Sequence, residues 1–211
     1  MIIAIVNQHG SAERSIVARN LAVLRARSGR KVCLVATDAP RHAAGWCTER
    51  STAGIQPWIA ARTMAPRSAK EKLAALRPLF NDILIDAGPR DTPRCHCVLA
   101  AARLAVVPVH GDEIDLACQY ALIARIKAAR AFNPALLVLF VMVSERGEPA
   151  PVARAAVWAH VARVDGAALA ATVLHAPAAH EYGAGRCVCD AATCDPEQAT
   201  EMQALYAEVY A

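Results

Sequence analysis

The residues best placed for chemistry follow the first apolar run of the chain. Residues 2–6 are all apolar and indicate a buried strand, and a polar stretch from Asn7 to Ser15 leads into a helical pattern. In a parallel α/β sheet, ligands bind beyond the carboxyl ends of the strands, where the amides of a helix N-terminus favour an anion. The turn over residues 7–15 is therefore the predicted phosphate site.

Cysteines form the second group, with eight in the chain and two Cys-x-Cys clusters. A core of this size in a reducing compartment does not need disulfides, so we expect mainly small buried or half-buried thiols. Zinc-site cysteines are normally separated by two to four residues, which makes zinc unlikely here. A metal- or redox-sensing regulator stays an alternative, and it requires five thiols to converge: Cys95, Cys97, Cys187, Cys189 and Cys194.

Composition and charge limit the class of protein. The chain has 211 residues, 55% of them hydrophobic and 20% charged, which predicts a single globular domain over 1–211 and excludes intrinsic disorder. No apolar run is long enough to span a membrane, and no basic leader begins the chain, so we expect a cytoplasmic protein. The net charge is +4, but the residues after 180 are acidic with Arg186 as their only base, which argues against membrane docking.

Apolar runs alternate with helical patterns, which predicts an α/β fold with a doubly wound, mostly parallel sheet and helices on both faces. Strands are expected at 2–6, 31–36, 82–86, 104–109, 136–144 and 167–174, with a further short strand near 55–60. Helices are expected at 15–27, 68–79, 94–102, 115–131, 151–163 and 199–210, and residues 37–54 are rich in turn formers.

Five segments in order resemble the ParA/MinD-type partition ATPases, which have a P-loop NTPase fold and a deviant Walker A loop, Lys-Gly-Gly-x-Gly-Lys-Thr. They are the first strand and loop (3–8), Val-Ala-Thr-Asp-Ala-Pro (35–40), the Walker B-like strand Asp-Ile-Leu-Ile-Asp-Ala-Gly (82–88), Val-Pro-Val (107–109) with Asp-Leu (115–116), and the last helix (204–209). The length is similar to that of short plasmid-type members. The resemblance implies ATP and Mg²⁺ as cofactors, a homodimer, a ParB-like adaptor protein as partner, and a role in plasmid, chromosome or cargo segregation.

Matched onto that loop, the chain departs from the family at the residues that handle phosphate. His9 replaces the signature lysine, Ser11 replaces the second glycine, Glu13 replaces the last loop glycine, and Arg14 replaces the loop lysine. A carboxylate in place of glycine adds bulk and repels phosphate, and a guanidinium is not equivalent to an ammonium group. The resemblance implies eight nucleotide-binding residues: His9, Gly10, Ser11, Ala12, Glu13, Arg14, Ser15 and Ile16.

The resemblance also assigns the magnesium and catalytic positions. Ser15 and Asp86 match the residues that hold magnesium, and Asp38 matches the residue tied to the attacking water, so Asp38 and Arg14 are the catalytic candidates. Carboxylates at strand ends also cap turns and helices, which is the structural alternative for both aspartates. Val143 stands where the family usually has an asparagine against the adenine base.

These replacements support two interpretations. In one, the protein still binds ATP, dimerises on it and hydrolyses it slowly. In the other, which we favour, it is a pseudo-ATPase that keeps the fold and a partner surface, because phosphoryl transfer depends on positioned positive charge and magnesium.

Surface cations are the last candidates. The family binds DNA non-specifically, and the resemblance assigns this role to Arg125, Lys127 and Arg130 in the helix over 115–131. The basic helix over 68–79 is a similar candidate, and a solvated helix face explains both sets of charges equally well. Three polar residues follow the last strand, where the family has a loop near the nucleotide and where an ordinary polar loop is the alternative: His175, His180 and Tyr182.

Overall fold

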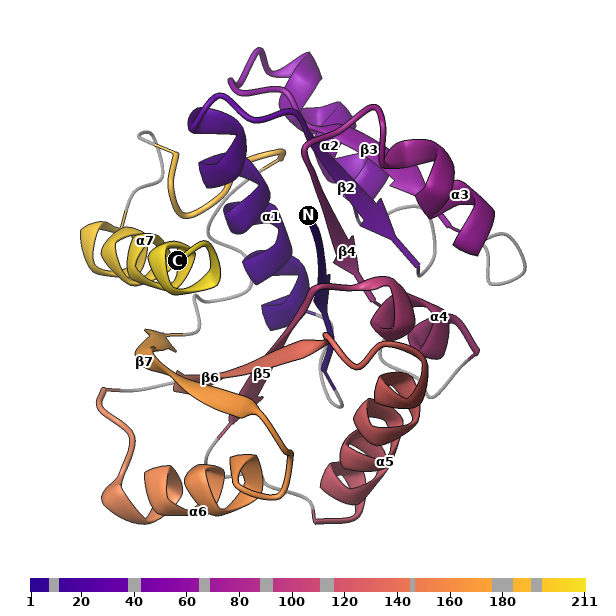
Figure 1. Cartoon of the computed structure of the whole chain (residues 1–211). Helices are drawn as coiled ribbons and strands as arrows, with labels where there is room; N and C mark the ends of the chain where they lie inside the picture. The colour runs from indigo at the N-terminus through magenta and orange to yellow at the C-terminus, as the bar shows by residue number, and fades with distance from the viewer. Residues whose placement is uncertain are drawn as a thin grey trace.

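The computed structural model describes residues 1–7, 12–37, 43–64, 69–87, 93–110, 116–144, 147–175, 184–190 and 195–211, in which strands and helices alternate (Figure 1). The strands are β1 (Ile2–Ile5), β2 (Val32–Ala36), β3 (Ala60–Thr63), β4 (Asp82–Asp86), β5 (Leu104–His110), β6 (Leu137–Ser144) and β7 (Ala167–His175). The helices are α1 (Ala12–Arg27), α2 (Ala43–Thr52), α3 (Ala69–Leu76), α4 (Pro93–Ala101), α5 (Leu116–Phe132), α6 (Pro151–Val161) and α7 (Pro196–Val209).

The strands form one parallel sheet in the order β3-β2-β4-β1-β5-β6-β7, which confirms the predicted α/β doubly wound class. From β1 the chain adds β2 and then β3 toward one edge of the sheet. Strand β4 inserts between β2 and β1, and β5, β6 and β7 then extend the sheet toward the other edge. The strand order therefore reverses beside β1, which is where ligands bind in such sheets. In the register of the sheet, Ile5 faces Asp86 of β4 and Val106 of β5.

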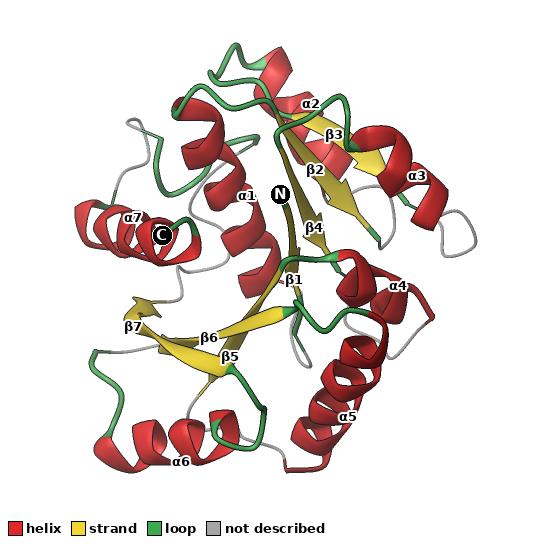
Figure 2. Cartoon of the chain, viewed as in Figure 1, coloured by secondary structure: helices red, strands yellow, loops and turns green. Residues whose placement is uncertain are grey.

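Helices cover both faces of the sheet (Figure 2). Helices α3, α4, α5 and α6 pack on one face, and α1, α2 and α7 pack on the other. Strand β1 serves both layers because side chains alternate along a strand: Ala4 enters the first core, and Ile3 and Ile5 enter the second. No helix in the described ranges has the length and apolar character that a membrane crossing needs.

Three local predictions were wrong. Helix α2 occupies the stretch expected to be turns, because Ala43, Trp46 and Cys47 share one face and bury it, although glycine, serine and threonine in the same stretch obscure the pattern. Strand β3 begins at Ala60, where the expected strand ends. Helix α1 begins at Ala12 rather than at Ser15, which places Glu13 and Arg14 in its first turn.

A buried ion pair attaches the segment 184–190 to α2. The Arg50 side chain has no exposed surface, and its guanidinium donates to both carboxylate oxygens of Asp190 at 2.7 and 3.0 Å and to the Gly185 carbonyl at 3.1 Å. Gly185 has φ +73°, and a Cβ there would lie 2.2 Å from the Arg50 backbone nitrogen. Only glycine fits this contact.

Candidate functional site

The candidate site lies at the carboxyl edge of the sheet, where β1, β2 and β4 end side by side. The Ala87 amide donates to the Ile5 carbonyl at 3.0 Å, and the Thr37 amide donates to the Asp86 carbonyl at 3.1 Å. These bonds hold the end of β4 between its two neighbours. Asp86, which is 5% exposed, lies next to the first turn of α1.

Both oxygens of the Asp86 carboxylate accept hydrogen bonds from that turn. Arg14 Nε donates to Oδ1 in a buried ion pair, and Ser15 Oγ donates to Oδ2 at 2.6 Å. Arg14 is only 1% exposed, so its guanidinium is held inside the protein at the helix start. The sequence had suggested a phosphate as the partner of Arg14. The pairing with Asp86 joins residues 72 positions apart, and no local pattern indicates it.

Magnesium fits this arrangement poorly. A serine hydroxyl and an aspartate carboxylate are suitable oxygen donors for it. However, the buried Arg14 guanidinium already neutralises Asp86, and a divalent cation placed there would be close to a fixed positive charge with little solvent to screen it. A magnesium ion at Ser15 and Asp86 would therefore require Arg14 to move away.

Glu13 turns toward β5. Its carboxylate lies 3.7 Å from Nε2 of His110 at the end of that strand, and the interaction with the His110 side chain lowers the pKa of Glu13. A negative charge is thereby kept at the start of α1, where the helix dipole favours it. Such a charge disfavours a phosphate at the same helix end.

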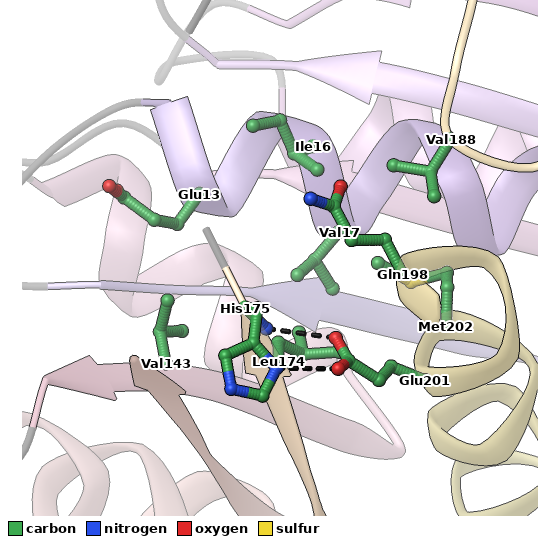
Figure 3. A pocket seen from close by; sticks show the side chains of 10 residues that line it. All are labelled: Glu13, Ile16, Val17, Val143, Leu174, His175, Val188, Gln198, Glu201 and Met202. Atoms are coloured by element: carbon green, nitrogen blue, oxygen red, sulfur yellow. Dashed lines mark hydrogen bonds and ion pairs between the residues drawn. The ribbon is translucent and has the colours of Figure 1, made fainter. Parts of the chain in front are cut away.

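A small cavity lies beyond the ends of β6 and β7, between α1 and α7 (Figure 3). Its walls are mainly apolar, with Ile16 and Val17 from α1 and Val143 and Leu174 from the strands. The volume is about 20 Å³, which is room for a single water molecule. Ligand pockets are typically an order of magnitude larger.

His175 and Glu201 form a polar contact at the edge of this cavity (Figure 3). The Nδ1 atom of His175 lies 2.5 Å from Oε1 of Glu201, and the His175 amide donates to Oε2 at 2.9 Å. Nε2 lies 3.0 Å from the Gly147 carbonyl. Because acceptors face both ring nitrogens, the imidazolium form is favoured, and the bond to Glu201 raises the pKa of His175.

The other predicted site residues divide into two groups. Ile16 lines the small cavity, and Ala12 opens helix α1. Seven of the predicted residues lie outside the described residues: His9, Gly10, Ser11, Asp38, His180, Tyr182 and Cys194. The side chain of Cys95 also lies outside what the structure describes.

The described cysteines do not converge. Cys97 is exposed on α4, on one side of the sheet, and Cys187 and Cys189 are buried in the core on the other side. The sheet separates them, so the shared site that the regulator hypothesis requires is not formed by these three thiols. Burial also raises the pKa of Cys47 to about 12, which makes that thiol a poor nucleophile or metal ligand. Within the described ranges, no group of three or more His, Cys, Asp or Glu side chains could hold a metal ion.

The three cations assigned to DNA differ in exposure. Lys127 is exposed on α5. Arg125 is 4% exposed and donates to the Ala121 carbonyl at 3.3 Å. Arg130 donates to the Leu136 carbonyl at 3.1 Å and also to the Asp165 carbonyl. Lys127 is thus the exposed member of this set. Arg130 fastens the end of α5 to its surroundings, whereas the cited bond of the buried Arg125 lies within α5 itself.

The sheet order, with a serine-bearing helix turn against a carboxylate at the end of the neighbouring strand, defines an α/β protein of the P-loop NTPase type. No protein-family model matches the chain. The chain is 30% identical over 172 residues to the chromosome-partitioning ATPase Soj of Thermus thermophilus, covering 67% of this chain and 68% of Soj. This chain belongs to the ParA/MinD family of partition ATPases.

Solved structures agree on the fold. A plasmid partition protein of Borrelia burgdorferi superposes with a TM-score of 0.66 at 14% identity, covering 99% of this chain and 96% of that one. The septum site-determining protein MinD of Pyrococcus horikoshii, in complex with Mg-ADP, superposes with a TM-score of 0.66 at 19% identity, covering 99% and 95%. At these identities the likeness concerns the fold.

Proposed function

We propose that this protein is a ParA-like partition or positioning protein that works as a pseudo-ATPase. The observation that carries the proposal is that Arg14 and Ser15 donate hydrogen bonds to both carboxylate oxygens of Asp86. In an ATPase of this fold, a cation on the loop has to meet the phosphates, and the strand-end carboxylate has to serve magnesium. Here the two groups neutralise each other inside the protein.

The free-energy cost of separating Arg14 from Asp86 determines how strongly Mg-ATP binding is weakened. Separating a buried ion pair so that one charge loses its partner costs about 3–5 kcal/mol. Each 1.4 kcal/mol corresponds to a tenfold change in a binding constant. Binding of Mg-ATP that had to displace Arg14 would therefore be weakened roughly 10²- to 10⁴-fold, in addition to the repulsion from Glu13.

Titration calorimetry with Mg-ATP tests this proposal. We expect the natural chain to show no heat of binding at millimolar ATP. The double variant Glu13→Gly/Arg14→Lys, which restores a glycine and a lysine, should gain measurable binding, and Arg154→Lys is the matched control far from the site. Micromolar binding by the natural chain that is lost in Asp86→Asn would overturn the proposal.

The second candidate is an ATP-switched dimeric ATPase. It is supported by the 2.6 Å bond between Ser15 and Asp86, which keeps hydroxyl and carboxylate next to each other as a magnesium site needs. Under this hypothesis Arg14 leaves Asp86 to pair with a phosphate, and Asp38 positions the attacking water. If Asp38→Ala leaves any measured turnover unchanged, this mechanism is wrong.

The assembly belongs to the same proposal. We infer a single domain over 1–211 that forms a homodimer and acts with a ParB-like adaptor, because family membership supports such partners. The pseudo-ATPase should be a dimer that is indifferent to nucleotide. Light scattering with and without Mg-ATP separates this from the ATP-dependent dimer of the second candidate.

Non-specific DNA binding is a further part of the ParA-like role, and the exposed charge of Lys127 supports it. Lys127→Ala should lower the slope of log affinity against log salt by about one, as expected for the loss of one phosphate contact. Arg125→Ala should instead lower the melting temperature, because Arg125 is buried. A chain that does not bind DNA at low salt contradicts this part of the proposal.

A further inference from the structure

A groove on the α3, α4 and α5 layer lies far from the nucleotide-type site. Its lining includes Ile2 at the start of β1, Ala101 at the end of α4, and Phe132 at the end of α5. These are positions at the amino edge of the sheet, whereas Asp86 lies at the carboxyl edge. In Figure 1 the three helices follow one another down the same side of the molecule. The volume of the groove is about 840 Å³, within the range of small-molecule ligand pockets.

The charge of the groove has one sign. Lys70 and Arg77 line it from the α3 side, both exposed, and no described residue lining it is acidic. Neither cation makes a hydrogen bond or ion pair with another described residue. They are seven positions apart along a helical path, since the Arg77 amide still donates to the Leu73 carbonyl. Two helical turns place them on one side, about 10 Å apart along the axis.

The floor of the groove between Lys70 and Arg77 is apolar and consists mainly of small side chains. Ala74 is exposed there, Leu73 one turn after Lys70 is 3% exposed, and Ala100 and Ala101 line the groove from α4, half-buried. Alanine side chains let another helix approach closely, because the distance between packed helices depends on the side chains at the contact. Phe132 also lines the groove and is 84% exposed, an unusual exposure for so large an apolar side chain.

We propose that this groove docks an acidic amphipathic helix of a partner protein. The complementary helix has carboxylates seven positions apart, opposite Lys70 and Arg77, and apolar residues three and four positions after each carboxylate, over Leu73 and the alanines. This is the helix-in-groove mode, in which the apolar stripe supplies affinity and the flanking charges fix the register. A nucleic acid would use the cations but would leave the apolar floor without a function.

The docking site is independent of the proposed pseudo-ATPase role, because no residue is shared between the groove and the Arg14–Asp86 pair. The test uses the full chain and two fluorescein-labelled synthetic helical peptides. One peptide carries glutamates seven positions apart with leucines three and four positions after each glutamate, and the other carries lysines in place of the glutamates. Fluorescence anisotropy measures the binding of each.

We expect the natural chain to bind the glutamate peptide and to bind the lysine peptide at least about tenfold more weakly. The charge reversal Lys70→Glu/Arg77→Glu should invert this preference. The matched control Arg154→Glu/Arg163→Glu, which makes the same change in net charge at two exposed residues outside the groove, should leave it unchanged. An equal loss in the control would show general attraction between charges and would overturn the proposal.

A second measurement localises the contact without altering charge. Cys97 is an exposed thiol lining the groove, so the bound glutamate peptide should slow its alkylation, read by mass spectrometry at that residue. Ala74→Trp, a substitution at an exposed helix position, should weaken binding of the glutamate peptide because the indole would fill the apolar floor of the groove. Unchanged alkylation of Cys97, or duplex DNA that binds the groove and is not displaced by the peptide, would also overturn the proposal.

Discussion

Removing the positive charge of Arg14 should destabilise the protein strongly. Arg14 is 1% exposed and the Asp86 side chain 6% exposed, so solvent does not replace the lost partner. In Arg14→Met the Asp86 carboxylate would stay buried, with the Ser15 hydroxyl and the charge of Arg19 near it but without its direct guanidinium partner. The expected cost is about 3–5 kcal/mol. For a chain of this length that corresponds to a fall in melting temperature of about 6–20 °C.

The assay is equilibrium urea unfolding of four proteins: the natural chain, Arg14→Met, Asp86→Asn, and the double variant. Each single change leaves a buried group without its partner, whereas the double variant leaves neither charge behind. The double variant should therefore cost at least about 2 kcal/mol less than the sum of the two singles. Arg154→Met is the control, because its ion pair with Glu148 is exposed and should contribute less than about 1 kcal/mol.

Two results would refute this reasoning. Additive costs in the double variant would mean that Arg14 and Asp86 do not depend on each other. A cost for Arg14→Met as small as that for Arg154→Met would mean that the Arg14 side chain is hydrated. Either result would also remove the main support for a pseudo-ATPase.

Three further predictions concern other parts of the molecule. Gly185→Ala should cost about 2–4 kcal/mol in urea unfolding, because φ +73° disfavours a side chain and the new Cβ would press on the Arg50 backbone. His175→Gln should destabilise the protein most below pH 6.5, the ordinary pKa of histidine. Because the pKa of His175 is raised in the folded state, the stabilisation by Glu201 is lost as the pH rises above 6.5 through the folded-state pKa. Cys47 should resist alkylation in the folded chain at about pH 8 and react only on unfolding, because burial raises its pKa to about 12.

Each of these predictions has a control and a contrary outcome. Gly54→Ala, with φ +67° and open space around the Cβ, should cost only about 1 kcal/mol, and an equal cost at both glycines would disprove the contact argument. For His175→Gln, a loss of stability relative to the natural chain that grows with rising pH would contradict the raised pKa of His175. For Cys47, alkylation as fast as that of the exposed Cys97 would show that the thiol is accessible.

Most of the strands and helices could be predicted because the local spacing of apolar residues indicates them. The strand over 82–86 has the bounds expected from its apolar run, and the strand over 104–109 is extended by His110 alone. Helix α2 was missed because weak helix formers surround its buried residues, and its burial against the sheet outweighs those preferences. Family membership was likewise available from the order of short motifs, which the likeness to Soj confirms.

The state of the candidate site was not predictable, because it depends on contacts between distant residues. Local patterns place Asp86 at the end of a strand, and Arg14 and Ser15 where a loop enters a helix. The contact between them arises from the fold, because β4 lies beside β1 and brings Asp86 against the first turn of α1, where Arg14 neutralises it. The groove lined by α3, α4 and the end of α5 likewise exists only because these three successive helices pack on one face of the sheet. Local patterns report which side of an element is buried, and the order of the strands decides which elements meet.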